Sequence, residues 1–184
     1  MLHKETKLIT WAACAMVMLF MVNFVTAGWI NQFGIIPRSV AGLPGIALSP
    51  FLHASMVHLL GNLVAFVPLS ILVVAGERNR YLKLCLFIIV VGGGAVWLIG
   101  RDANHVGASG LIFGLWAYLL ATAWYKKSFK SLMIGAVVLV GYGSMIWGFM
   151  PRAYVSFEAH ICGAWAGYAY AYLTEKLGAR AITT

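Results

Sequence analysis

Six long apolar stretches constrain the fold of this chain more than any other feature of its sequence. They cover approximately residues 9–30, 56–75, 84–100, 106–125, 132–150 and 157–173. A helix needs about 20 mostly apolar residues to cross the hydrocarbon core of a bilayer. Charged residues make up 10% of the chain, whereas a soluble domain carries roughly 25%. We therefore predict an all-α membrane protein that forms a single domain, a six-helix transmembrane bundle over residues 1–184.

The positions of lysine and arginine predict how this bundle is oriented. If the N-terminus lies inside, the outside segments hold three of the 13 basic residues, Arg38, Arg101 and Arg152. The inside segments hold the other ten, which are Lys4, Lys7, Arg78, Arg80, Lys83, Lys126, Lys127, Lys130, Lys176 and Arg180. Cytoplasmic segments carry such an excess of basic residues, so we expect both termini to be cytoplasmic. The same bias explains the net charge of +8 without nucleic-acid binding.

Two further features bear on the cellular compartment. The first apolar stretch is too long for a cleaved signal peptide, and no clear small-residue cleavage site ends it. Cys14, Cys85 and Cys162 all fall in apolar stretches, and their odd number and spacing predict neither a disulfide framework nor a metal site. Without organelle-type presequence features, a bacterial inner membrane is the expected location.

The connection between the first two apolar stretches, about residues 31–55, is unusual for a loop. It contains Pro37, Pro44 and Pro50 together with several large apolar residues. This composition predicts a segment that folds back onto the membrane surface. An ordinary loop with incidental apolar residues is equally compatible with the composition.

Four polar side chains are expected at a similar depth, just below the outer surface. His58 and Asn62 begin the second stretch, and they lie on one helical face because they are four residues apart. Ser109 begins the fourth stretch and His160 begins the sixth. A lone serine can bond back to its own helix, and a lone histidine can be structural. Polar groups are costly in lipid, however, so three helices placing them together indicates a functional site.

Glycines flank two of these residues and predict close helix packing. Gly107, Gly110 and Gly114 surround Ser109, while Gly163 and Gly167 form a stripe with His160. Small residues let helix backbones approach closely in lipid. We expect this approach to bring the His160 ring within hydrogen-bond reach of the Ser109 hydroxyl.

A serine beside a histidine can act as a nucleophile with its general base. An acidic third member is not evident, because Glu158 faces away from His160 and Asp102 lies in a short loop. We therefore predict a Ser-His dyad. An oxyanion formed during acyl transfer needs hydrogen-bond donors. His58, Asn62 and the backbone amide of Ser109 are the expected donors, and no metal or cofactor is required.

The same residues form motifs that resemble those of rhomboid intramembrane serine proteases. Residues 107–110 match the family motif G-x-S-G, and residues 160–167 match H-x-x-G-x-x-x-G. Residues 58–62 match H-x-x-x-N. The three motifs occur in the family order, and the resemblance covers nearly the whole chain in a minimal six-span form.

The resemblance implies a serine endopeptidase with Ser109 as nucleophile and His160 as base and acid. It implies that Phe113 packs under His160 and that His58 and Asn62 stabilise the oxyanion. It also implies a membrane-embedded first loop, here without the Trp-Arg pair of many members, and a gate and cap formed by the fifth span and residues 148–156. The implied substrates are single-span membrane proteins, cut in or near the span. The oligomeric state stays open.

Two other functions are compatible with parts of the sequence. A catalytically inactive relative would bind membrane proteins for quality control, but such relatives usually lack the serine or the histidine. A small transporter would need polar residues across the whole membrane, and an inverted repeat is typical of that class. The polar residues here gather near one surface instead.

Overall fold

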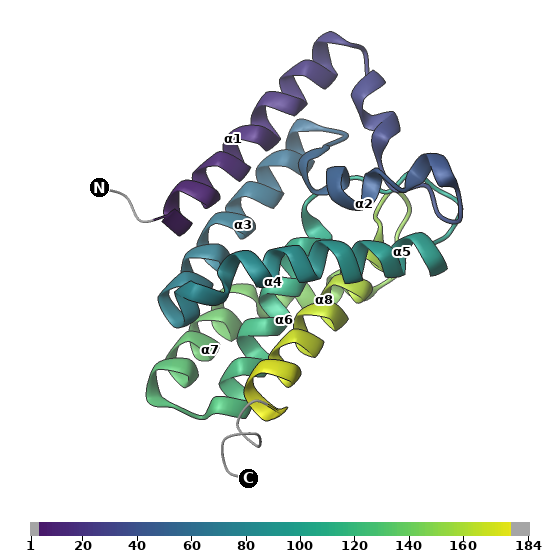
Figure 1. Ribbon diagram of the computed structural model, residues 1–184. Coiled ribbons are helices and arrows are strands. Elements are labelled where there is room, and N and C mark those ends of the chain that lie inside the picture. Colours follow the sequence, from purple (N-terminus) through teal and green to yellow (C-terminus); the bar gives the residue numbers. More distant parts are fainter. Residues whose placement is uncertain (1–3, 178–184) are drawn as a thin grey trace.

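The computed structural model describes residues 4–177 and is built from helices (Figure 1). Within these residues, six long helical segments follow one another along the chain. They are α1 (Lys4–Val25), α3 (Met56–Glu77), the continuous segment α4 (Tyr81–Phe87), η5 (Ile88–Gly92) and α5 (Gly93–Ile99), α6 (Ser109–Lys126), α7 (Phe129–Tyr142) and α8 (Phe157–Ala171). Each corresponds to one of the six predicted apolar stretches. Arg180, which was counted among the inside residues, lies outside the described residues.

Three helical stretches within residues 4–177 are long and apolar enough to cross a membrane by themselves. They are Lys4–Val25, Met56–Ile99 and Phe129–Phe149. The second of these turns back on itself at η4 (Arg78–Arg80), where Glu77 leaves helical geometry with φ −141° and ψ 68°. As a result, α3 and α4–α5 run in opposite directions (Figure 1). The apolar helices support an integral membrane protein, and the crossing of all six segments stays a prediction.

The first helix differs in its limits from the predicted stretch at residues 9–30. It begins at Lys4 and ends at Val25, because the chain then turns through Ala27 and Gly28, which have positive φ angles of 51° and 90°. A short 3₁₀ turn, η1 (Trp29–Phe33), follows. The buried amide of Asn23 stabilises this turn, since its side-chain oxygen accepts a hydrogen bond from the Asn31 backbone at 3.1 Å.

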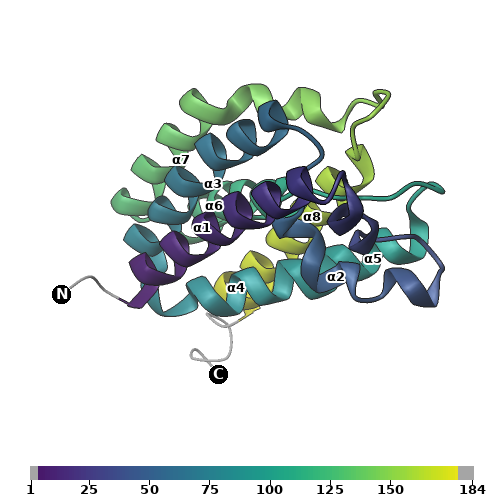
Figure 2. The same cartoon turned by 90° about the horizontal axis from the view of Figure 1, so that it is seen from above.

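Helix α6 is the central element of the bundle. Eleven of its 18 residues are buried, among them Leu115, Tyr118 and Leu119. Figures 1 and 2 show it surrounded by the other long helices. Its neighbours are protein rather than lipid, which explains why it can carry Ser109, Thr122 and two glycines, Gly110 and Gly114. By contrast, α7 buries only Ser131, Gly135 and Val138 and lies at the edge of the bundle.

The connection between α1 and α3 is folded into short helical turns. These are η1, η2 (Val40–Gly42), α2 (Gly45–Leu48) and η3 (Ser49–Phe51). This loop packs on the segment that leads into α6, because Ile35 and His105 form an isolated antiparallel bridge. The amide of Gly107 also donates to the carbonyl of Ser49 at 2.9 Å. The predicted loop therefore supports the backbone just before Ser109.

Ion pairs show which helix ends lie together. Glu5 at the start of α1 is 3.9 Å from Arg78, and Arg80 pairs with Glu175 in η7 (Tyr172–Leu177). The two ends of the described chain therefore lie at the same end of the bundle. An even number of crossings requires this arrangement, although the side of the membrane on which this end lies is still a prediction.

Candidate active site

The four polar residues singled out from the sequence line one cavity. His58 and Asn62 on α3, Ser109 on α6 and His160 on α8 all border a cavity of about 890 Å³. Each lies in the first two turns of its helix, and Ser109 is the first residue of α6. The cavity is also bordered by residues 101–106 and 153–156. The tertiary structure thus brings together all four predicted side chains near one end of the bundle.

The imidazole of His160 is held by two contacts. Its Nδ1 lies 2.7 Å from the carbonyl oxygen of Gly148, and its ring stacks on Phe113 with the centroids 4.1 Å apart and the planes 7° from parallel. A carbonyl oxygen can only accept a hydrogen bond, so Nδ1 of the neutral ring carries the proton. Nε2 is then left with a free lone pair and can accept a proton.

The glycines of α6 and α8 lie directly against the backbone of the facing helix. A methyl group at Gly163 would overlap the carbonyl oxygen of Gly110, and one at Gly167 would overlap the carbonyl oxygen of Gly114. His160 lies three residues before Gly163, on the same face of α8. This packing sets the distance between the helix that carries His160 and the helix that carries Ser109.

Hydrogen-bond donors surround the start of α6. The side-chain nitrogen of Asn62 is buried and makes no hydrogen bond within the described protein. Ala108, which precedes α6, supplies no side-chain cap, so the positive end of the helix dipole faces the region of Ser109. Gly107 has a φ of 120°, and a methyl group there would lie 2.6 Å from Cε1 and Nε2 of His58. Only glycine therefore allows the backbone to pass this close to His58.

Both candidate carboxylates are paired with arginines. Glu158, whose side chain is 11% exposed, has its Oε1 3.5 Å from Nε of Arg101. Asp102 pairs with Arg38, which also donates to the carbonyl oxygen of Gly100 at 2.7 Å. The position that an acidic residue would occupy beside His160 is taken by the Gly148 carbonyl. Arg38 anchors the first loop to the end of α5.

A buried histidine that no sequence motif includes, His53, packs against the site. Its side chain is fully buried and meets the His58 ring edge-on, with the ring centroids 5.1 Å apart. Burial, together with the nearby His58, lowers the pKa of His53 to about 4, so the ring is neutral at pH 7. Its position five residues before His58 was a possible signal. No sequence signal could have indicated the contact of the Gly148 carbonyl with His160, because every residue carries a backbone carbonyl.

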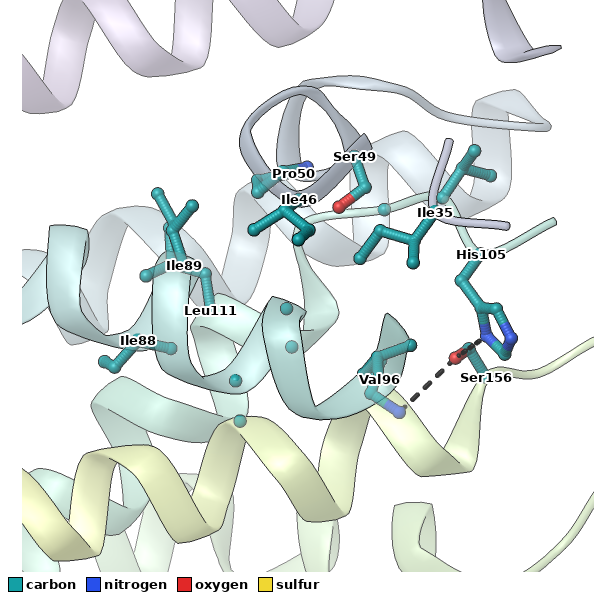
Figure 3. Close-up of a pocket in the computed structure, with 17 residues that line it drawn as sticks. Ile35, Ile46, Ser49, Pro50, Ile88, Ile89, Val96, His105, Leu111 and Ser156 are labelled. Atoms are coloured by element: carbon teal, nitrogen blue, oxygen red, sulfur yellow. Dashed lines mark hydrogen bonds between the residues drawn. The ribbon is translucent and has the colours of Figure 1, made fainter. Parts of the chain in front are cut away.

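The segment before α8 is tied to the segment before α6 across the mouth of the cavity. Arg101 donates to the carbonyl oxygen of Val155 at 2.5 Å, and Nδ1 of His105 lies 2.5 Å from the Ser156 hydroxyl. Figure 3 shows His105 and Ser156 together at the edge of a smaller cavity of about 40 Å³, between the first loop, α5 and α8. Residues 148–156, the predicted cap, are called the cap segment, and these two contacts hold its C-terminal end to residues 101–105.

Loss of this latch should expose the cap segment to proteases. The double variant Arg101→Gln with Glu158→Gln removes the ion pair without leaving a buried charge alone. A partly exposed ion pair contributes about 1 kcal/mol, which corresponds to about a fivefold change in the open fraction. Tryptic cleavage after the exposed Arg152 should accelerate about fivefold, as measured by mass spectrometry of the fragments. The double variant Lys126→Gln with Glu77→Gln, which removes an ion pair at the other end of α6, is the matched control. An unchanged rate in the variant of Arg101 and Glu158 would show that the latch does not hold the cap.

Comparison with known proteins defines the family. The rhomboid domain model matches residues 43–176. An uncharacterised protein of Mycobacterium tuberculosis is 33% identical over 178 residues, which cover 91% of this chain and 74% of that protein. An uncharacterised Mycobacterium leprae protein is 33% identical over 171 residues, 86% of this chain and 68% of its own length. The chloroplast rhomboid-like protein 11 of Arabidopsis thaliana is 33% identical over 141 residues, 68% of this chain and 50% of its own length.

The chain therefore belongs to the rhomboid family, which is of the intramembrane protease type. This confirms the resemblance that the three sequence motifs indicated. The family and the apolar helices together identify an integral membrane protein.

Proposed function

We propose that this protein is a serine endopeptidase that hydrolyses peptide bonds within the membrane by means of Ser109 and His160. The main support is that both residues line one cavity while the Nδ1–H of His160 donates to a carbonyl oxygen. Nε2 is thereby the acceptor that a serine nucleophile needs. The Ser109 oxygen would attack the substrate carbonyl as its proton passes to Nε2. His160 would then give that proton to the leaving amine, and water would release the acyl group.

The negative charge formed during attack would be stabilised by donors at the start of α6. Asn62 supports this role because its buried side-chain nitrogen lacks a partner in the described protein. A substrate oxyanion would supply that partner in the transition state, when the interaction contributes most. His58 and the Ser109 amide would complete the set of donors.

The Gly107 position allows a test of this arrangement. Gly107→Ala should displace His58, because the new methyl group would lie 2.6 Å from the ring and the backbone φ of 120° is strained for alanine. Loss of one oxyanion donor costs about 10²-fold in kcat, and we expect a loss of that size in reporter cleavage. Gly61→Ala is the control, since Gly61 borders the same cavity but has open space at its Cβ position. Equal activities of the two variants would exclude His58 as a donor.

The position of the cavity supports a substrate that is itself a membrane segment. Water must reach the site, and Ser109, His58 and His160 all lie at helix starts, within a turn or two of one bundle surface. A transmembrane substrate has its peptide bonds engaged in its own helix and must unwind before attack. We propose single-span membrane proteins with helix-destabilising residues as substrates. The proposed setting is a bacterial inner membrane, with the active site opening to the outer side and both termini in the cytoplasm.

The proposal is tested with the purified full chain in detergent. A transmembrane reporter with a helix-destabilised cleavage region should be cut, and EDTA should not change the rate. A fluorophosphonate should block cleavage and label Ser109, as identified by peptide mass spectrometry. Cleavage that continues after complete labelling of Ser109 would contradict the mechanism. Absence of both cleavage and labelling would favour an inactive relative that binds membrane proteins.

A further inference from the structure

A second histidine–serine pair lies next to the proposed dyad and takes no part in its chemistry. His105 is 3% exposed, and its Nδ1 lies 2.5 Å from the hydroxyl oxygen of Ser156 (Figure 3). His105 lies four residues before Ser109 in the chain. Ser156 lies four residues before His160. One side-chain contact therefore joins the two segments that lead into the two proposed catalytic residues.

The hydrogen bonds of this pair have defined directions. Nε2 of His105 lies 3.1 Å from the backbone carbonyl oxygen of Arg101. That oxygen can only accept, so Nε2 carries the proton of the neutral ring, and Nδ1 accepts a hydrogen bond from the Ser156 hydroxyl. The hydroxyl oxygen accepts in turn from the Ala159 amide at 3.4 Å. Both ring nitrogens and the hydroxyl proton are thereby used, which fixes the orientation of both side chains.

On the side of α6, the backbone of His105 is fixed to the first loop. Its amide donates to the carbonyl oxygen of Ile35 at 2.9 Å, and its carbonyl oxygen accepts from the Ile35 amide at 2.9 Å. Gly107 donates to the carbonyl oxygen of Ser49, also at 2.9 Å. Helix α6 begins two residues later, at Ser109. The position of Ser109 therefore depends on the segment that these contacts hold in place.

On the side of α8, Ser156 fixes the first turn of the helix. It is the N-cap residue, since its hydroxyl oxygen accepts a hydrogen bond from the Ala159 amide. Its carbonyl oxygen also accepts from the amide of His160, at 3.3 Å. A shift of Ser156 would therefore be passed on to the backbone of His160.

We propose that His105 and Ser156 are positioning residues, which set the relative orientation of the two proposed catalytic side chains. This inference rests on the proposed protease function. The glycine contacts between α6 and α8 begin at Gly110 and Gly163, and they determine how far apart the helices lie. The buried pair precedes both catalytic residues and determines how the two helix starts face each other. Misplacement of reacting groups by about 1 Å can cost about 10²-fold in rate.

Removal of the pair should slow the chemistry and leave substrate binding unchanged. We expect His105→Leu and Ser156→Ala each to lower kcat for reporter cleavage about 10²-fold, with KM within about twofold of wild type. The double variant should lose no more than either single variant, because both remove the same hydrogen bond. Conservative variants should recover most of the activity, since Ser156→Thr keeps the hydroxyl and His105→Asn keeps an acceptor near the Nδ1 position.

The kinetics of fluorophosphonate labelling of Ser109 separate positioning from a loss of folded protein. The final extent of labelling counts the folded enzyme, whereas the labelling rate reports the reactivity of the serine. His105→Leu should lower the rate about 10²-fold and leave the final extent close to that of wild type. Ser128→Ala is the matched control, because Ser128 caps α7 through the Ser131 amide at 3.2 Å and does not border the cavity that contains Ser109. It should lower the unfolding midpoint and keep the wild-type labelling rate.

The outcomes distinguish this inference from the protease proposal. A wild-type kcat in His105→Leu, additive losses in the double variant, or a loss of labelling extent instead of rate would overturn the positioning role while the protease proposal stands. An equal loss of rate in Ser128→Ala and Ser156→Ala would do the same, because capping alone would then explain it. If wild type is neither labelled nor active, the protease proposal fails and the positioning role fails with it.

Discussion

Replacement of Ser109 by alanine is expected to lower kcat/KM for reporter cleavage by at least about 10⁴-fold. The variant lacks the oxygen that would form the acyl intermediate, and serine hydrolases that lose their nucleophile suffer losses of this size or larger. The fold should be unaffected, because Ser109 is the first residue of α6 and does not cap it. The measurement is reporter cleavage by wild type and variant at equal concentration, with thermal unfolding as a check on folding.

The companion variant His160→Ala distinguishes a dyad from two independent contributions. Groups that act as one unit are strongly non-additive, so the double variant should be no less active than either single variant. Ser39→Ala is the matched control, because Ser39 lies in the first loop and does not border the cavity. Substantial cleavage by Ser109→Ala would require a different nucleophile, and additive losses in the double variant would show that Ser109 and His160 contribute independently.

The second large effect is expected at the contact between α6 and α8. Gly163→Ala would place a methyl group on the carbonyl oxygen of Gly110, and this overlap involves backbone that no side-chain rotation can relieve. Overpacking usually costs about 1–3 kcal/mol and occasionally more, so we expect a loss of about 3 kcal/mol in the free energy of unfolding. Cleavage should fall too, because separating the helices moves His160 away from Ser109.

A glycine in open space provides the control for this substitution. Gly141 lies in α7, and a methyl group there would meet no atom within 4 Å. Gly141→Ala should therefore be neutral or slightly stabilising, since alanine favours helix by up to about 1 kcal/mol over glycine. Unfolding of both variants in the same detergent gives the comparison. If Gly163→Ala unfolds at the wild-type midpoint, the close packing of α6 on α8 is not what holds the two helices together.

The sequence predicted the parts of this protein that depend on local composition and spacing. Apolar runs determine where membrane helices form, so the sequence by itself predicts the six helical segments. Glycines at helical spacing beside Ser109 and His160 indicated which helices approach closely, and the structure has that contact. Residue type also restricts the chemistry, because few side chains can serve as nucleophile and base. The catalytic roles themselves, and the side of the membrane on which the termini lie, stay predictions.

Tertiary structure alone decided which partners hold these groups. The contact of His160 with the Gly148 carbonyl leaves no trace in the sequence, because a backbone carbonyl is common to every residue. The pairing of Arg101 with Glu158, and of Arg38 with Asp102, joins residues 57 and 64 positions apart, and each carboxylate could have paired elsewhere. Spacing constrains neighbours on one helix, whereas contacts between helices depend on the packing of the whole bundle.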